Sequence, residues 1–364
     1  MIYLDYQATT PLAPEARDAM LPWLDGPDGT GFGNPHSAHR LGRQAAAAVD
    51  LAREQVAALF PPGGTVIFTG SATEAINLAM RGSAPVGDTR PVAVSAIEHA
   101  AVLDTARALG GPVDVLPVDG EGILDMTSLA QLRSGTRLVA VMQVNNEIGT
   151  IQPVGLAADA AHDAGALFLC DAVQGAGKLD APAAADMIAV SAHKLHGPKG
   201  IGALWVRDGL AIEPIITGGG QEQGLRSGTL SPALCAGFGA AASLSIKERI
   251  SAGQHVETLW KRLVDLLPGW TVNGSTAHRW FGNCNIRREG VDVARLMSDV
   301  RDVCFSAGSA CASGSGRPSH VLKAIGLDVA SAKSSVRFGF GRYTDIAAID
   351  HAAALIREAA ARQD

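Results

Sequence analysis

Six short apolar runs between residues 65 and 206 restrict the fold more than any other feature of the sequence. Each run is nearly continuous and is separated from the next by a segment with helix-like patterning. The runs are 65–69, 91–95, 138–142, 166–170, 187–191 and 203–206. Strands that are apolar on both faces are typical of a mainly parallel sheet covered by helices. The sequence therefore predicts an α/β fold.

The pattern changes toward the C-terminus. Helices are predicted at about 38–60, at 231–250 and at 256–267, and strands and helices then alternate irregularly. These later elements are strands at 283–286, 303–306 and 335–340, helices at 291–300 and 319–324, and a last helix. We expect a large domain of residues 14–250. Residues 1–13 together with 251–364 are expected to form a smaller α+β domain.

Composition excludes several classes of protein. The net charge of -6 and the absence of a basic cluster argue against direct binding to nucleic acid. The most apolar stretch, 233–246, is too short and too rich in small residues to span a membrane, and the start resembles no signal peptide, so we expect a cytoplasmic protein. Five cysteines without a CxxC pair indicate neither a disulfide framework nor a zinc site, and no metal site is predicted.

Polar side chains follow five of the apolar runs, at the point where each predicted strand ends. Ligands of parallel α/β sheets bind beyond the carboxyl ends of the strands. The five ends supply Ser71 and Thr73, Glu98 and His99, Asn145 and Asn146, Asp171 and Gln174, and Ser191, His193 and Lys194. Each group also has a structural interpretation, as a helix cap, a first-turn residue or an Asn-rich turn. Together these groups match the needs of one anionic cofactor.

Lys194 makes that cofactor more specific. The chain has only seven lysines, of which Lys194 and Lys199 flank one Gly/Pro turn and the other five lie outside any recognisable cluster. A lysine amine can form a Schiff base, as in pyridoxal phosphate enzymes. Asp171 could pair with the protonated pyridine nitrogen of that cofactor, although it could equally cap the next segment.

Cys311 differs from the other four cysteines. Cys170, Cys235, Cys284 and Cys304 lie in apolar strand or helix patterns, and we interpret them as structural. Cys311 lies in a run of small residues, at about 307–317, that cannot pack a core and should be accessible. Access is one requirement of a reactive thiol.

With these residues in view, the chain resembles the cysteine desulfurases of the IscS/NifS type, in the class V aminotransferase group of pyridoxal phosphate enzymes. The resemblance runs from residue 3 to about 342. It rests on the segments 3–11, 33–37, 98–103, 145–149, 171–174, 191–194, 226–229 and 309–311. It implies the pyridoxal phosphate type I fold, with a seven-stranded, mainly parallel sheet, and a homodimer.

The resemblance also implies roles for single residues. Lys194 would hold the cofactor and move protons, Cys311 would carry sulfur and could act as a transient iron–sulfur ligand, and His99 would stack on the ring. Asn146 and Arg337 would bind the substrate carboxylate. The cofactor-binding set is Ala72, Thr73, His99, Asn146, Asp171, Gln174, Ser191, His193 and Lys194, with Thr229 from the other subunit.

The implied reaction converts L-cysteine to L-alanine, leaves a persulfide on Cys311 and passes the sulfur to an acceptor. That acceptor would be an iron–sulfur scaffold or another sulfurtransferase. The order Gly70-Ser71 departs from the usual Ser-Gly of the family, and the chain ends at Asp364 without the tail by which many relatives dock a scaffold. The alternatives are selenocysteine lyase or another class V reaction, and a non-catalytic sulfur carrier.

Overall fold

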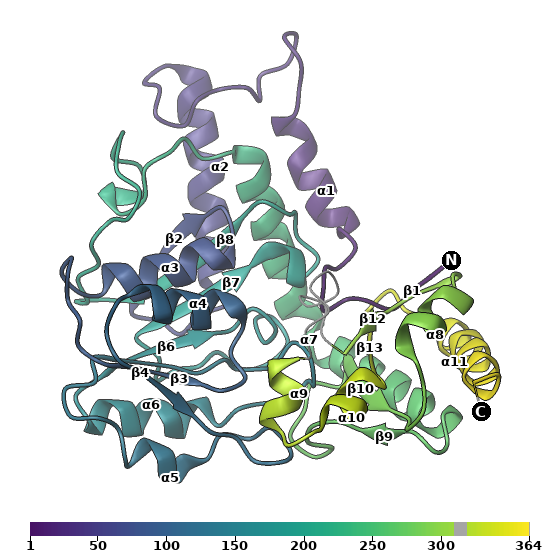
Figure 1. Cartoon of the computed structure of the whole chain (residues 1–364). Helices are drawn as coiled ribbons and strands as arrows, with labels where there is room; N and C mark the ends of the chain where they lie inside the picture. The colour runs from purple at the N-terminus through teal and green to yellow at the C-terminus, as the bar shows by residue number, and fades with distance from the viewer. Residues whose placement is uncertain (309–318, 364) are drawn as a thin grey trace.

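Seven strands form one large sheet, as expected (Figure 1). The computed structural model describes residues 1–308 and 319–363. The strands, in spatial order, are β2 (Gly64–Thr69), β8 (Gly202–Arg207), β7 (Met187–Ser191), β6 (Leu167–Asp171), β5 (Leu138–Ala140), β3 (Val92–Ser95) and β4 (Val113–Leu116). Among these strands, β8 runs in the opposite direction to the other six. The α/β prediction is confirmed, and six of the seven strands lie where the apolar runs predicted them.

Alternate side chains of the strands pack on opposite faces of the sheet, which explains why the runs are continuously apolar. Phe68 and Phe168 belong to the cluster that includes residues of α2, α6 and α7. Ile67 and Leu169 belong to the cluster formed with α3 and α4 on the other face. The covering helices are α1 (Pro14–Met20), α2 (Arg40–Ala57), α3 (Ala72–Gly82), α4 (Ala100–Ala108), α5 (Met126–Leu129), α6 (Val154–Asp163) and α7 (Pro232–Leu266).

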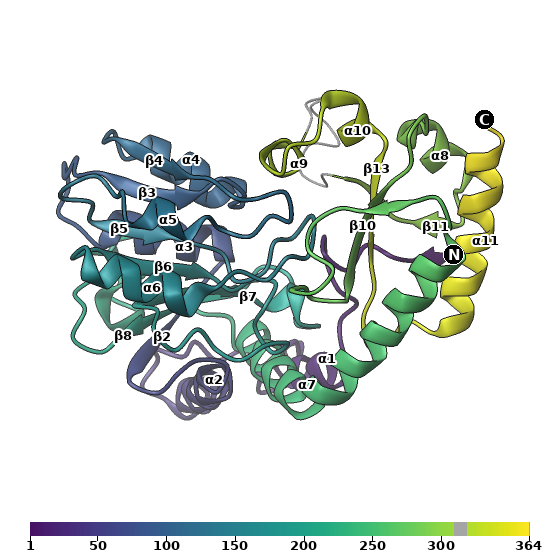
Figure 2. The same cartoon turned by 90° about the horizontal axis from the view of Figure 1, so that it is seen from below.

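A second body of strands and helices lies beyond the large sheet (Figure 2). Its antiparallel sheet has the order β12 (Ser306–Ala307), β13 (Ser335–Gly339), β10 (Asn283–Arg287) and β9 (Thr271–Val272). Around it lie α8 (Val293–Asp299), α9 (His320–Ala324), α10 (Val329–Lys333) and α11 (Ile346–Ala361). The N-terminal strand β1 (Ile2–Tyr3) pairs with β11 (Val303–Cys304), so the first residues do pack here.

The long helix α7 differs from the sequence prediction, because one helix of 35 residues replaces the two expected between 231 and 267. Cys235 and Phe238 near its start lie in the core beside the large sheet, whereas Leu259 and Leu263 lie in the core of the second body. Gly253 disfavours a helix by only about 1 kcal/mol, and burial at both ends outweighs this cost. The domain boundary expected at residue 250 falls inside α7, and the division itself stays a prediction.

Short 3-10 turns complete the described chain: η1 (Leu21–Trp23), η2 (Ala192–Lys194) and η3 (Glu222–Gly224). Among the described residues, none of the helices combines the length and apolar character needed to cross a membrane. The turn η2 matters most for the site, because it continues β7 and carries Lys194.

Candidate active site

The predicted strand-end residues surround one cavity of about 330 Å³. Its lining includes all of the predicted cofactor and substrate residues that belong to this chain's own site. They are Ala72, Thr73, His99, Asn146, Asp171, Gln174, Ser191, His193, Lys194 and Arg337. The carboxyl ends of β2, β6 and β7 therefore meet at one place with a residue of the second body, Arg337 on β13.

The amine of Lys194 is held by the N-terminal segment. Its Nζ donates to the backbone oxygen of Gln7 and to that of Ala8, the latter at 2.8 Å. Gln174 also donates to the Gln7 oxygen, at 3.1 Å. Residues that are far apart in the sequence thus place the amine in the cavity, and the contribution of Gln7 and Ala8 was missed by the strand-end argument.

Asp171 ends β6 and is only 5% exposed. Burial raises the pKa of its carboxyl group, and His99 and then Lys194 act in the opposite direction. The Val173 amide donates to Oδ1 at 3.0 Å, but the described residues supply no arginine to it. A buried carboxylate in this state is well suited to a cationic ligand group.

His99 lies both at the start of a helix and at the cavity. It caps the N-terminus of α4, where its Nδ1 accepts a hydrogen bond from the Ala101 amide at 3.1 Å. It also lines the cavity beside Asp171. Since Nδ1 is the acceptor, a neutral ring carries its proton on Nε2. Glu98, directly before it, is fully buried, and burial together with Asp171 raises the pKa of its carboxyl group well above the ordinary value.

The start of α3 lines the cavity and has the features of a candidate anion-binding site. Ser71 caps the helix by accepting from the Glu74 amide at 3.2 Å, and Ala72 and Thr73 form the first turn. Free backbone N–H groups and the helix dipole at such a start favour phosphate. Gly202 permits the turn, since a Cβ there would lie 2.6 Å from the carbonyl carbon of Ser71.

His193 and Ser191 line the same cavity. Burial, followed by the charge of Lys194, lowers the pKa of His193 to about 4. The ring is therefore neutral near pH 7, and its Nδ1 lies 3.1 Å from Oγ1 of Thr9. Its contribution to anion binding would be a hydrogen bond and not a charge.

The two asparagines of the turn after β5 separate in function. Asn145 is completely buried, and its Oδ1 accepts from the amides of Glu147 and Ile148 at 2.8 and 2.9 Å. Asn146 lines the cavity instead, and its backbone oxygen accepts from Arg337 Nη1 at 3.1 Å. The Asn-rich turn is thus structural at its first residue and a candidate binding element at the second.

Lys178 was placed outside any site by its sequence position, and the structure corrects this. It lines a smaller cavity, of about 40 Å³, together with Lys194, His196 and Arg342. Burial, then the charges of Lys194 and Arg342, lower the pKa of Lys178 to about 7. The spacing of residues in the sequence did not predict that Lys178 is a neighbour of Lys194, because the two lysines lie in different turns.

Thr229 does not line the cavity of its own chain and is exposed. Cys311, predicted to carry sulfur, lies outside the described residues. Cys170, Cys235 and Cys284 are buried, as expected for structural thiols, and burial raises the pKa of Cys235 and Cys284 to about 12. Thiols of this kind are poor nucleophiles near pH 7.

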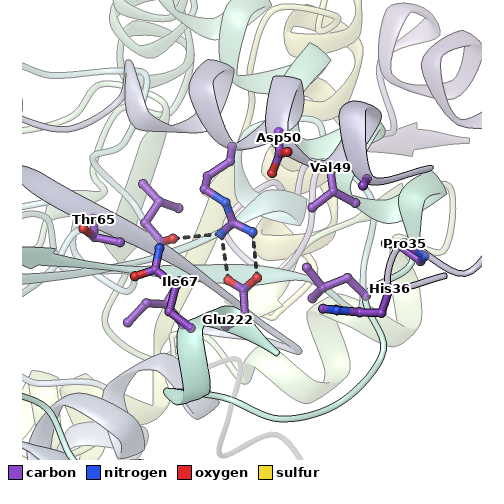
Figure 3. A pocket seen from close by; sticks show the side chains of 12 residues that line it. Pro35, His36, Val49, Asp50, Thr65, Ile67 and Glu222 are labelled. Carbon is purple, nitrogen blue, oxygen red and sulfur yellow. Dashed lines mark hydrogen bonds and ion pairs between the residues drawn. The ribbon is translucent and has the colours of Figure 1, made fainter. Parts of the chain in front are cut away.

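Another cavity, of about 210 Å³, lies between α2, β2 and η3 with the segment after it, and shares no lining residue with the cavity around Lys194 (Figure 3). An ion pair closes one side of it, since Arg53 donates to both carboxylate oxygens of Glu222 at 2.7 and 2.6 Å. The Phe68 amide donates to Glu222 as well, at 2.6 Å. These bonds tie the segment that leads to Thr229 onto the edge of the large sheet.

The residues of the first cavity fit pyridoxal phosphate. They provide an amine for its aldehyde, a buried carboxylate for its ring nitrogen, and a helix start with hydroxyl groups for its phosphate. The donor set is that of a cofactor with one anionic end and one cationic ring atom.

Comparison with known proteins supports this interpretation of the cavity. A family profile described as "Aminotransferase class-V" matches residues 2–351. The "Cysteine desulfurase, mitochondrial" of Drosophila melanogaster is 43% identical, with 97% of this chain and 79% of that protein covered. A "Cysteine desulfurase IscS" of Anaeromyxobacter sp. is 42% identical, covering 98% and 92%.

Solved structures show the same relationship. One described as "NIFS-LIKE PROTEIN" has a TM-score of 0.90 and 31% identity, and 98% of each chain is covered. Another, "SspA in complex with cysteine", has a TM-score of 0.83 and 32% identity, covering 95% of this chain and all of that one. The protein belongs to the class V aminotransferase family and, within it, to the pyridoxal phosphate-dependent cysteine desulfurases.

Proposed function

We propose that the enzyme converts L-cysteine to L-alanine by moving the substrate sulfur onto Cys311 as a persulfide. The main observation behind this proposal is that one cavity is lined by Lys194, Asp171, His99 and Arg337. Pyridoxal phosphate, once bound, supplies the electron sink that weakens bonds at the substrate carbons. The overall step balances, because cysteine and one thiol become alanine and one persulfide.

In this proposal the residues of the chain bind and move protons. Arg337 and Asn146 hold the carboxylate of cysteine, for which a guanidinium offers paired donors. The amine of Lys194 would carry a proton to and from the substrate carbons. Lys178 and Arg342 line a small cavity together with Lys194, and a cation beside an amine favours its neutral, proton-accepting form.

The remaining side chains orient the cofactor. Asp171 would keep the ring nitrogen charged, His99 would stack on the ring and Gln174 would contact its phenolic oxygen. Ala72, Thr73, Ser191 and His193 bind the phosphate. The position of each in the cavity lining supports these assignments.

A homodimer completes the site, with Thr229 of one subunit reaching the phosphate of the other. The exposure of Thr229, and the ion pair of Arg53 with Glu222 that anchors its segment, support a role outside its own chain. The persulfide would pass to an acceptor protein, an iron–sulfur scaffold or another sulfurtransferase. The cytoplasmic location stays a prediction, because relatives include mitochondrial and mitosomal enzymes.

The test compares wild-type enzyme with Cys311→Ser in the presence of cysteine and a thiol reductant. We expect wild type to produce alanine and sulfide in equal amounts and the variant to lose both, while each still binds pyridoxal phosphate through Lys194. Sulfide release by Cys311→Ser at the wild-type rate would refute the persulfide and favour a selenocysteine lyase or another class V reaction. Failure of the wild type to take up the cofactor would instead favour a sulfur carrier.

A further inference from the structure

Arg337 is a buried cation whose donors are only partly used. Its side chain is 1% exposed on β13 and lines the cofactor cavity. Nη2 donates to Oδ1 of Asp5 at 2.9 Å and Nη1 to the backbone oxygen of Asn146 at 3.1 Å. Nε is buried and has no hydrogen-bond partner among the described residues. A guanidinium has five N–H donors, so donors remain for a ligand.

Asp5 is the carboxylate that neutralises this arginine. It lies just after β1, and a backbone bridge joins it to Gly339 at the end of β13. Its Oδ1 also accepts from Oγ of Ser306 at 2.9 Å. Ser306 lies on β12 directly opposite Arg337 in the sheet. The Asp5 carboxylate is therefore fixed from two strands, and it contacts the guanidinium on one side only.

A buried guanidinium requires a compensating charge, because desolvation of an isolated ion costs several kcal/mol. A carboxylate paired side-on, through two hydrogen bonds, would take two of the five donors and leave fewer of them for the substrate. Asp5 instead supplies charge and fixes orientation through a single nitrogen. This arrangement leaves the arginine desolvated, oriented and incompletely paired.

We propose that Asp5 is the positioning residue for the substrate carboxylate: it holds Arg337 in place through Nη2 so that the remaining donors face an incoming carboxylate. The inference rests on the proposed function, in which Arg337 binds the carboxylate of cysteine. It extends that function to a residue from the N-terminal segment that need not touch substrate or cofactor.

The test uses the cofactor-loaded enzyme and Asp5→Ala. Loss of one charge-assisted hydrogen bond should raise the KM for L-cysteine by about tenfold. The kcat at saturating cysteine and the affinity for pyridoxal phosphate should stay within about twofold of wild type, because Asp5 contacts neither. A merely structural defect would lower kcat and cofactor affinity as well as raise KM, and that result would overturn the inference.

A double-variant experiment checks that Asp5 acts through Arg337. In an Arg337→Ala background, adding Asp5→Ala should change KM by less than about twofold, because the group being positioned is gone. Full additivity of the two changes would overturn the inference. Ser306→Ala, which removes only the second bond to Asp5, should raise KM by about two- to threefold and is a milder variant if Asp5→Ala fails to fold.

Asp350→Ala is the matched control, since it breaks the exposed Arg262–Asp350 ion pair, whose residues do not line the cavity, and should leave KM unchanged. The outcomes separate the two proposals. If wild type makes no alanine from cysteine, the proposed function fails. If wild type is active but Asp5→Ala keeps the wild-type KM, only the positioning inference fails.

Discussion

Asp171→Asn should have opposite effects on the protein without and with its cofactor. Without cofactor, the Asp171 carboxylate is buried beside Glu98, and burial raises the pKa of both groups. An acid whose pKa is raised by folding binds protons more tightly in the folded state, so it lowers stability as the pH rises above the unfolded pKa. Asparagine keeps an oxygen for the Val173 amide and removes this charge. The apoprotein should therefore become more stable near pH 7 and lose less stability between pH 4 and 7.

With cofactor, the same substitution removes a charge-assisted hydrogen bond to the ring nitrogen. Such bonds contribute about 1.5–3 kcal/mol, which corresponds to roughly 10- to 100-fold in affinity. We expect the dissociation constant for pyridoxal phosphate to rise by that factor, and alanine production to fall at least as much because the ring is no longer held in its protonated state. Absorbance titration of the apoprotein with cofactor measures the affinity, and urea unfolding at several pH values measures stability.

Asp180→Asn is the matched control, because that carboxylate is 92% exposed and should alter neither quantity. Unchanged cofactor affinity in Asp171→Asn would refute the assigned pairing with the ring. A less stable Asp171→Asn apoprotein would refute the argument from buried charge. The two failures are independent, since one concerns the bound ring and the other the empty protein.

Two further predictions follow from close packing and from buried charge. Gly202→Ala should weaken pyridoxal phosphate binding and lower stability by about 1–3 kcal/mol, because the new Cβ would lie 2.6 Å from the carbonyl carbon of Ser71; a thermal melt and a cofactor titration indistinguishable from wild type would contradict this. Lys178→Met should flatten the stability profile above neutral pH: folding lowers the pKa of Lys178 from 10.5 to about 7, so the wild-type apoprotein gains stability as the pH rises between these values, and the variant has no such group. Urea unfolding at several pH values from 6.5 to 10 measures the stability of both proteins. If stability changes with pH in the same way in the two proteins, folding does not lower the pKa of Lys178.

The strands of the large sheet could be predicted because each is long enough and apolar enough to be recognised from its own residues. The exception is β4, whose segment Val113-Asp-Val-Leu116 is short and interrupted by Asp114. It lies at the edge of the sheet, where one side lacks a partner and a charged residue is tolerated. The merging of two predicted helices into α7 was equally hidden, because it depends on cores at its two ends.

The active site was predictable to the extent that it follows the strand-end rule. Asp171 and Lys194 come directly after buried strands, and the structure places both in one cavity. Asp5 and Gln7 do not follow such a strand. Only the family resemblance of residues 3–11 indicated that their segment was of interest. Lys178 gave no signal at all. The residue-by-residue roles stay predictions.

The apolar runs and the polar residues that follow them by themselves determined an α/β sheet, and they predicted the edge at which ligands bind and the lysine most suited to a carbonyl cofactor. These properties are local, because strand burial and the direction of a strand end depend on a few neighbouring residues. Only the tertiary structure decided which distant groups complete the site: the Gln7 and Ala8 carbonyls on Lys194, and Asp5 on Arg337. Such contacts join residues more than 180 positions apart. They form because a buried charge requires a partner nearby in space. The periodicity of the sequence does not indicate which distant residue supplies that partner.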